Sequence, residues 1–280
     1  MFEATRVRRM QRPKPSPLEV VLSLAAALLL AACQTTEAIK SPVADAARSW
    51  QYGHHSLPRG VLKQGQFSSL EEIRNDPESW PARVAESKLQ PGVRLPAVLY
   101  LHGCAGFRAG ERWAHTVRES GYAFFAPDSF QRPGRENLCG TGRRAMIDKR
   151  IPMRRQELDY ALEQLKKAQW IDQRRIVLMG FSEGAQTASA YRGNAFAAVV
   201  LIGTDCRFSG GSPATPKSVP VLNLVGSGDE WGYGAGCNIP DNVSGSKKVV
   251  LDKRRHDLSG DAEARRALGR FLKQCCGGAG

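Results

Sequence analysis

Six short apolar segments between residues 97 and 251 constrain the fold of this 280-residue chain more than any other feature. None of them alternates apolar and polar residues, so both faces of each strand would be buried, as in a parallel sheet covered by helices. Apolar side chains at spacings of three and four predict helices over 154–169 and 262–273. Strands alternating with helices predict one α/β domain, a doubly wound and mostly parallel sheet flanked by helices. The six segments are 97–101, 122–126, 176–179, 197–202, 219–225 and 248–251.

The first 32 residues have the composition of an export signal. Five basic residues precede an apolar run over 20–32, which is shorter than the ~20 residues needed to cross a bilayer. Leu30-Ala31-Ala32-Cys33 resembles the cleavage site of bacterial lipoproteins, which implies cleavage before Cys33 and its lipidation. An ordinary signal cleaved nearby is the alternative. The sequence thus predicts a signal peptide over 1–32, a tether over 33–56 and the α/β domain over 57–280.

A lipidated Cys33 would anchor the protein in the bacterial cell envelope, facing the periplasm. Gln34 follows that cysteine, which favours the outer over the inner membrane by analogy with lipoprotein sorting. The formal net charge is +13, but basic segments interleaved with aromatic residues and nucleic-acid motifs are both missing from the sequence. Nucleic acid is therefore not an expected partner. Six further cysteines, an even number, favour disulfides in an oxidising compartment, and they allow 15 connectivities.

The segment Gly180-Phe181-Ser182-Glu183-Gly184 follows the third apolar run directly. Glycines on both sides of a serine permit a cramped turn in which a strand ends and a helix starts at once. Such a turn exposes the serine hydroxyl as a nucleophile. The pattern predicts that Ser182 attacks an acyl carbon.

The other catalytic groups should follow later strands, because the carboxyl ends of parallel strands meet at one edge of the sheet. His256 is the only histidine after Ser182, so it is the expected general base. Asp229 is preferred over Asp205 as the acid that orients His256, because Asp229 follows a glycine-rich strand end nearer the histidine loop. The expected oxyanion donors are the backbone N–H groups of Glu183 and Cys104.

Several motifs together resemble the dienelactone hydrolase family of α/β-hydrolases: LYLHGCAG (99–106), GYAFFAPDSF (121–130), MGFSEGA (179–185), LVGSGDEWGYGAGC (224–237) and RRHDL (254–258). The resemblance covers about residues 95–275. It implies disulfides joining Cys104 to Cys139 and Cys206 to Cys237. Founding members use a cysteine nucleophile where this chain has Ser182, and many relatives with a serine are general esterases or peptidases.

Substrate contacts are predicted from two features. Trp231 and Tyr233 lie near Asp229 and are candidates for the acyl pocket. Residues 131–155 hold eight basic side chains against two acidic ones, so Arg132 and its neighbours are candidates for binding an anionic substrate. A solvated charged face is the preferred interpretation of that stretch.

Taken together, these patterns predict a serine hydrolase that cleaves small-molecule esters, lactones or related acyl bonds without a metal or an organic cofactor. Two alternatives stay open. The same triad would serve a serine peptidase, and the fold could persist as a catalytically silent binding protein of the envelope.

Overall fold

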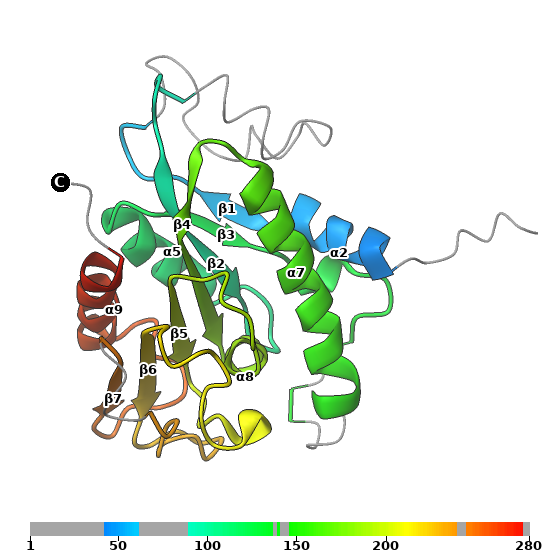
Figure 1. Ribbon diagram of the computed structural model, residues 1–280. Helices are drawn as coiled ribbons and strands as arrows, with labels where there is room; N and C mark the ends of the chain where they lie inside the picture. Colours follow the sequence, from blue (N-terminus) through cyan, green and yellow to red (C-terminus); the bar gives the residue numbers. More distant parts are fainter. Residues whose placement is uncertain (1–41, 62–88, 137–138, 141–145, 240–244, 277–280) are drawn as a thin grey trace, which may run out of the picture. The chain divides into compact units, whose positions relative to one another are not determined.

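A seven-stranded sheet with the order β1-β3-β2-β4-β5-β6-β7 organises the protein (Figure 1). The computed structural model describes residues 42–61, 89–136, 139–140, 146–239 and 245–276. All neighbouring strands from β3 to β7 are parallel, and β1 alone runs antiparallel to β3. The strands are β1 (His54–Ser56), β2 (Leu95–Leu101), β3 (Ala123–Ala126), β4 (Ile171–Phe181), β5 (Ala198–Ile202), β6 (Val221–Gly226) and β7 (Lys247–Leu251).

The predicted fold class is confirmed, and each of the six apolar segments coincides with one of the strands β2 to β7. Strands β2, β3, β5 and β6 are buried along their whole length, as expected for strands covered on both faces. Strand β7 differs, because it lies at the edge of the sheet and exposes Lys247 and Lys248. Charged side chains of this kind discourage pairing with another sheet.

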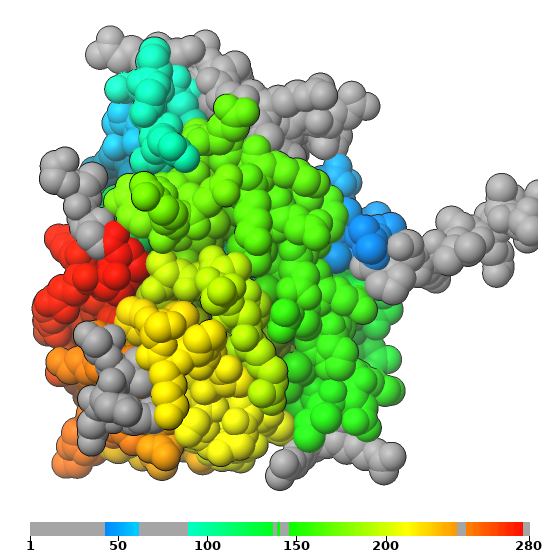
Figure 2. All heavy atoms as spheres, in the orientation of Figure 1, coloured from blue at the N-terminus to red at the C-terminus, as the bar shows by residue number. Residues whose placement is uncertain are grey.

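Helices cover both faces of the sheet (Figure 1). Helices α5 (Gly110–Glu119) and α9 (Ala262–Cys275) pack together on one face. Helices α2 (Pro42–Gln51), α7 (Ile151–Lys167) and α8 (Glu183–Ser189) pack on the other, where side chains fill the space between the ribbons (Figure 2). The predicted helices over 154–169 and 262–273 correspond to α7 and α9.

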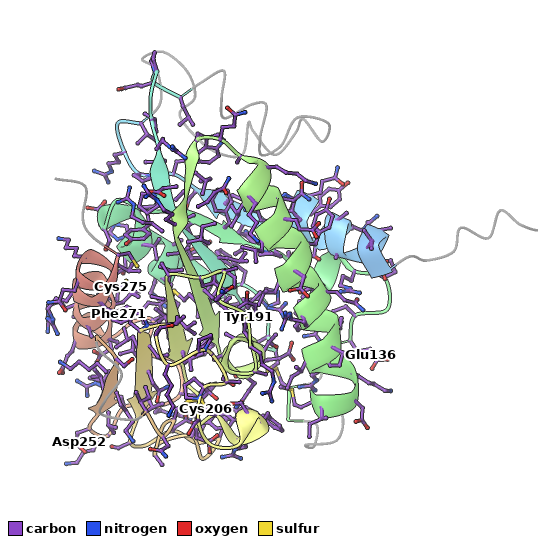
Figure 3. The ribbon with its side chains drawn as sticks, in the orientation of Figure 1. Glu136, Tyr191, Cys206, Asp252, Phe271 and Cys275 are labelled. Atoms are coloured by element: carbon purple, nitrogen blue, oxygen red, sulfur yellow. A yellow bond between two sulfur atoms is a disulfide. The ribbon has the colours of Figure 1, made fainter. Side chains whose placement is uncertain are left out.

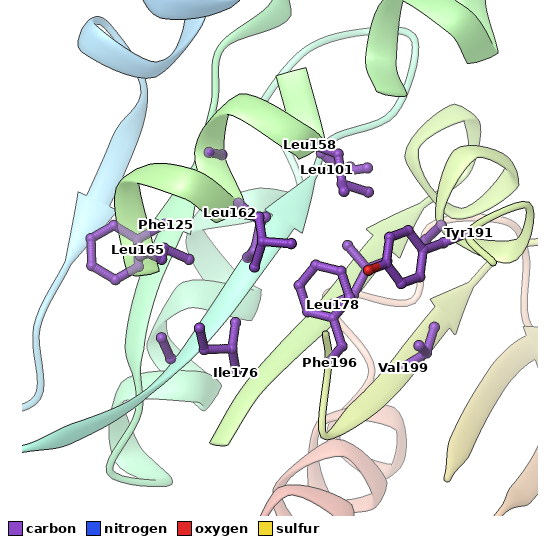
Figure 4. Close-up of a cluster of buried hydrophobic side chains, with 14 of the residues drawn as sticks. Leu101, Phe125, Leu158, Leu162, Leu165, Ile176, Leu178, Tyr191, Phe196 and Val199 are labelled. Atoms are coloured by element: carbon purple, nitrogen blue, oxygen red, sulfur yellow. The ribbon is translucent and has the colours of Figure 1, made fainter. Parts of the chain in front are cut away.

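Helix α7 is held to the sheet by a row of leucines. Leu158, Leu162 and Leu165 are buried in one hydrophobic cluster with Ile176 and Leu178 of β4 (Figure 4). Each fully buried leucine contributes on the order of 2 kcal/mol to folding. This packing fixes α7 beside the strand that carries Ser182.

Three short helical turns occupy the loops at the carboxyl ends of strands. They are the 3₁₀ turns η1 (Ser129–Gln131) and η3 (Arg207–Ser209) and the π-helical turn η2 (Met146–Arg150), which continues into α7. Cys206, just after β5, lies at the same end of the sheet as Asp252, just after β7 (Figure 3). The loops of this end therefore converge.

The predicted tether is too long at its carboxyl end. Residues 42–51 form α2, which packs on α7, and residues 54–56 form β1, which pairs with β3. Trp50 is buried and stacks on Phe125 of β3, so this segment belongs to the folded domain. No sequence pattern predicts this segment, because a three-residue edge strand carries almost no apolar pattern.

The predicted signal peptide, Cys33 and Gln34 lie outside the described residues. Within the described part of the chain, we find no helix that is both long and apolar enough to cross a membrane.

Candidate active site

Ser182 occupies a strained turn between β4 and α8. Its φ of 54° and ψ of −116° place it in a region that non-glycine residues rarely adopt. The glycines explain how the turn fits: a Cβ on Gly180 would lie 2.5 Å from the carbonyl carbon of Gly184, and a Cβ on Gly184 would overlap the carbonyl oxygen of Leu101. The geometry is that of a nucleophile elbow.

His256 is paired with Asp229. Asp229 Oδ2 lies 2.7 Å from His256 Nδ1, and Asp229 Oδ1 accepts the backbone N–H of Trp231 at 2.8 Å. The other carboxylate considered, Asp205, instead binds the guanidinium of Arg207, with its two oxygens 2.8–3.0 Å from the nitrogens. Of the two, Asp229 is thus the one positioned to orient the histidine.

The imidazole of His256 is enclosed by aromatic rings. Its centroid lies 5.0 Å from the ring of Phe181, 5.7 Å from Tyr233 and 6.2 Å from Trp231. The backbone N–H of His256 donates to Glu230 Oε2 at 3.0 Å, which fixes the loop. The backbone N–H of Glu230 itself, then that of His256 and then Arg255 hold the pKa of Glu230 below its usual range.

Ser182 and His256 line the same cavity, whose volume is about 650 Å³. This size suits a small organic ligand. The predicted pocket residues Trp231 and Tyr233 also line it, as do both residues assigned as oxyanion donors. The lining further includes Gly103, Gly106, Arg108, Met146, Arg150, Phe181, Gln186, Arg207, Phe208 and Asp257.

Two disulfides join the loops around the cavity. Cys104 is bonded to Cys139, and Cys206 to Cys237, as the family resemblance implied. Cys104 and Cys139 both line the cavity, so the first disulfide fixes the loop that carries one expected oxyanion donor. Cys275 and Cys276 are free thiols.

Arg132 does not line this cavity, in contrast to the prediction. Its guanidinium donates to the carbonyl oxygen of Met153 at 3.0 Å and to Gln156 Oε1 at 2.9 Å, and it lies 3.6 Å from Glu157. Among the residues that the structure describes, Arg132 therefore binds α7 and not the candidate substrate space.

The preferred interpretation of 131–155 as a solvated face is also wrong for four of its arginines. The side chains of Arg132, Arg135, Arg150 and Arg154 are at most 7% exposed. They surround two buried carboxylates, Glu157 and Glu183, which offset the cost of burying the positive charges. No local pattern indicates this cluster, because its acidic partners lie outside the basic stretch. Arg143 and Arg144 lie outside the described residues.

Gly203, which directly follows β5, has a supporting role that was not predicted from the sequence. Its φ is +62°, and a Cβ at this position would lie 2.8 Å from Cε1 of His256. The sequence did contain a signal for this role: a glycine stands directly after the apolar run 197–202, where catalytic groups are expected. Among the described residues, we find no group of three or more His, Cys, Asp or Glu side chains arranged to hold a metal ion.

A doubly wound parallel sheet in which a strand, a strained serine and a helix follow one another defines an α/β-hydrolase. The sequence model of the dienelactone hydrolase family matches residues 81–234, more than half of the chain. The protein is a member of the dienelactone hydrolase family and thus a hydrolase.

Several solved structures contain chains that are similar to this one. The esterase PE8 has 16% identity and a TM-score of 0.45, over 66% of this chain and 94% of that one. A putative dienelactone hydrolase from Klebsiella pneumoniae subsp. pneumoniae has 17% identity and a TM-score of 0.45, over 66% and 89%. The esterase domain of a Rhodothermus marinus protein has 16% identity and a TM-score of 0.45, over 67% and 90%. No curated protein matches the chain.

Proposed function

We propose that the protein is a serine hydrolase that cleaves ester, lactone or related acyl bonds with Ser182, His256 and Asp229 as its triad. One observation carries the proposal: Ser182, strained at the end of β4, shares a cavity with a histidine whose Nδ1 lies 2.7 Å from a carboxylate. This arrangement brings a nucleophile, a base and an orienting acid to one place.

Acylation follows from this geometry. Ser182 Oγ forms a bond to the acyl carbon as its proton passes to His256 Nε2. Asp229 accepts the Nδ1–H of the histidine, which fixes the tautomer and stabilises the imidazolium. The tetrahedral intermediate then collapses, the bond to the leaving oxygen breaks, and that oxygen takes the proton from Nε2.

Deacylation repeats these steps with water. Water gives its proton to His256 as it attacks the acyl-enzyme, and the bond to Ser182 Oγ then breaks with return of the proton to the serine. In both halves, negative charge develops on the former carbonyl oxygen. The backbone N–H groups of Glu183 and Cys104, which both line the cavity, are the donors assigned to it.

The cavity lining favours a small acyl substrate with apolar and anionic parts. Phe181, Phe208 and Trp231 offer apolar surface, and three arginines line the space against two carboxylates, those of Glu183 and Asp257. The arginines are Arg108, Arg150 and Arg207. We therefore assign recognition of an anionic substrate group to these three arginines and not to Arg132.

A fluorophosphonate probe tests the proposal, because it reacts with an activated serine. We expect labelling of the wild-type protein and its loss in Ser182→Ala. Labelling that persists in Ser182→Ala, or no labelling of the folded wild type, would contradict the proposal and favour the silent binding protein. Turnover of a panel of aryl esters, lactones and peptide amides then separates an esterase from the alternative peptidase.

We further propose that the protein is a lipid-anchored protein of the bacterial envelope facing the periplasm, in the outer membrane in preference to the inner. The support is the sequence of residues 1–34 with its lipobox-like end at Cys33. Metabolic labelling with a radioactive fatty acid should mark the wild type but not Cys33→Ser. Equal labelling of both proteins would refute the anchor.

A further inference from the structure

We propose that Arg154 is a positioning residue that fixes the two oxyanion donors, the backbone N–H groups of Cys104 and Glu183, relative to each other. The inference rests on the proposed function and extends it to a side chain outside the cavity. Arg154 lies on α7, its side chain is fully buried, and it is not among the residues that line the cavity. Any effect on the reaction must therefore pass through its neighbours.

The first neighbour is the loop that carries the Cys104 N–H. Nη2 of Arg154 donates to the carbonyl oxygen of His102 at 3.0 Å, and Nη1 lies 3.2 Å from His102 Nε2. The backbone of Gly103 and Cys104 follows directly. Because Arg154 binds both the carbonyl group and the ring of His102, it fixes the point at which this loop leaves β2.

The hydrogen-bond partners of His102 define its protonation. Its Nδ1 lies 2.7 Å from the carbonyl oxygen of Gly103, which can only accept, so Nδ1 carries the proton. Its Nε2 accepts the backbone N–H of Ser129 at 3.0 Å and faces the Arg154 guanidinium. Burial and the positive charge of Arg154 lower the pKa of His102 well below its usual value. A neutral His102 thus connects Arg154 to the Gly103 carbonyl.

The second neighbour is Glu183, whose backbone N–H is the other donor. Its carboxylate is 2.6 Å from Arg135 and 3.4 Å from Arg150, and Arg154 Nε lies 3.9 Å from Oε1. The guanidinium of Arg154 thus faces the elbow on one side and the oxyanion loop on the other. Glu157, one turn further along α7, contacts Arg154 Nη1 at 3.0 Å and holds it in place.

A planar, five-donor guanidinium suits this role, since it reaches several acceptors in fixed directions at once. Oxyanion donors act only when they lie within hydrogen-bond distance of the charge that develops in the transition state. A small displacement of either donor would weaken binding of the transition state more than binding of the ground state. Loss of the Arg154 contacts should therefore lower kcat and leave KM nearly unchanged.

The test compares Arg154→Lys with Arg155→Lys. Both substitutions keep the charge and lie on the same turn of α7, but Arg155 is partly exposed and pairs with Asp159. With an aryl ester, and with active sites counted by fluorophosphonate titration, we expect kcat per titrated site to fall about 10–100-fold in Arg154→Lys. Arg155→Lys should keep the wild-type kcat.

A boronic acid separates positioning from a general structural role, because it forms a tetrahedral anionic adduct with an activated serine. Its inhibition constant should rise in Arg154→Lys by the factor by which kcat/KM falls. A purely structural role would lower the melting temperature and the titrated fraction while each remaining site kept its normal kcat. That result, or a rise in KM with unchanged kcat, would overturn the proposal.

Glu183→Gln provides a second variant if Arg154→Lys does not fold. It keeps the backbone N–H and the side-chain shape but removes the charge that the arginines hold, so kcat per site should fall in the same way. Wild-type kcat in a folded Glu183→Gln protein would contradict the proposal. A wild type that no fluorophosphonate labels would overturn the proposed function and this inference together, whereas a labelled wild type with fully active variants overturns only the inference.

Discussion

The imidazole of His256 rests directly on the backbone of Gly203. A Cβ at residue 203 would lie 2.8 Å from Cε1 and 3.0 Å from Nδ1 of the ring. Gly203 directly follows β5, which lies beside β4, the strand that leads into Ser182. The glycine thus leaves the space that the candidate base occupies when it pairs with Asp229.

Gly203→Ala should reduce activity by displacing His256. The new methyl group has no room, and the φ of +62° adds backbone strain of about 1 kcal/mol. We expect kcat for an aryl ester to fall at least about tenfold, since shifts of about 1 Å in catalytic groups have effects of this order. Steady-state kinetics at a pH near 8 measures it.

Gly210→Ala is the matched control for this substitution. Gly210 also has a positive φ, +80°, but a Cβ there would meet no atom within 4 Å. The control carries the strain without the steric contact, so it should lose stability and keep its kcat. Equal kcat values for the two alanine variants would show that Gly203 does not support His256.

Asp229→Asn should be far more damaging than Asp205→Asn. An amide in place of Asp229 would favour the wrong tautomer of His256, with an expected loss of about 10³–10⁴-fold in kcat. Asp205→Asn removes only the ion pair with Arg207, so kcat should change less than about threefold. Comparing the two variants on one ester substrate decides between the carboxylates. A larger loss in Asp205→Asn would reverse our assignment.

The buried His102 should make folding stability depend on pH. Its pKa is well below the usual value in the folded protein, chiefly because of burial, with Arg154 and Arg135 acting in the same direction. The unfolded chain binds the proton near pH 6.5, so this contribution to stability is complete above about pH 6.5 and is lost as the pH falls. The slope for one proton reaches about 1.4 kcal/mol per pH unit.

Urea unfolding of the wild type and of His102→Asn at about pH 7, 6 and 5 measures this contribution. The asparagine variant should be less stable at neutral pH, and its deficit should shrink as the pH falls. The charged and titratable groups that act on His102, namely Asp128, Arg154, Arg135 and His54, are the same in both proteins, so the comparison isolates the contribution of His102. A deficit that is the same at every pH would contradict a depressed pKa of His102.

The disulfide between Cys206 and Cys237 should stabilise the domain substantially. The two cysteines are 31 residues apart and fully buried. Chain-entropy arguments give a loss of about 3–4 kcal/mol when a loop of this length is opened. The double variant Cys206→Ser/Cys237→Ser should show this decrease in urea unfolding, whereas Cys275→Ser/Cys276→Ser, which removes two free thiols, should change stability by less than about 1 kcal/mol.

Local patterns were sufficient for strands β2 to β7 and for the turn around Ser182. The six apolar runs became β2 to β7, and all but the edge strand β7 are apolar because strands buried on both faces need continuous apolar sequence. Gly180 and Gly184 predicted the strained turn at Ser182, since that turn depends only on residues next to it in the chain. The small strand β1 and helix α2 were missed, because their places in the fold come from pairing with β3 and packing on α7.

The sequence by itself therefore determined the α/β architecture, the serine turn and the order in which the candidate base and acid follow it. Only the tertiary structure decided that Asp229 and not Asp205 contacts His256, and that Arg132 and Arg154 are buried beside carboxylates. The reason is physical: periodicity and turn chemistry are local properties of the chain. The partner of a charged group depends on which distant segments the sheet brings within a few ångströms of it.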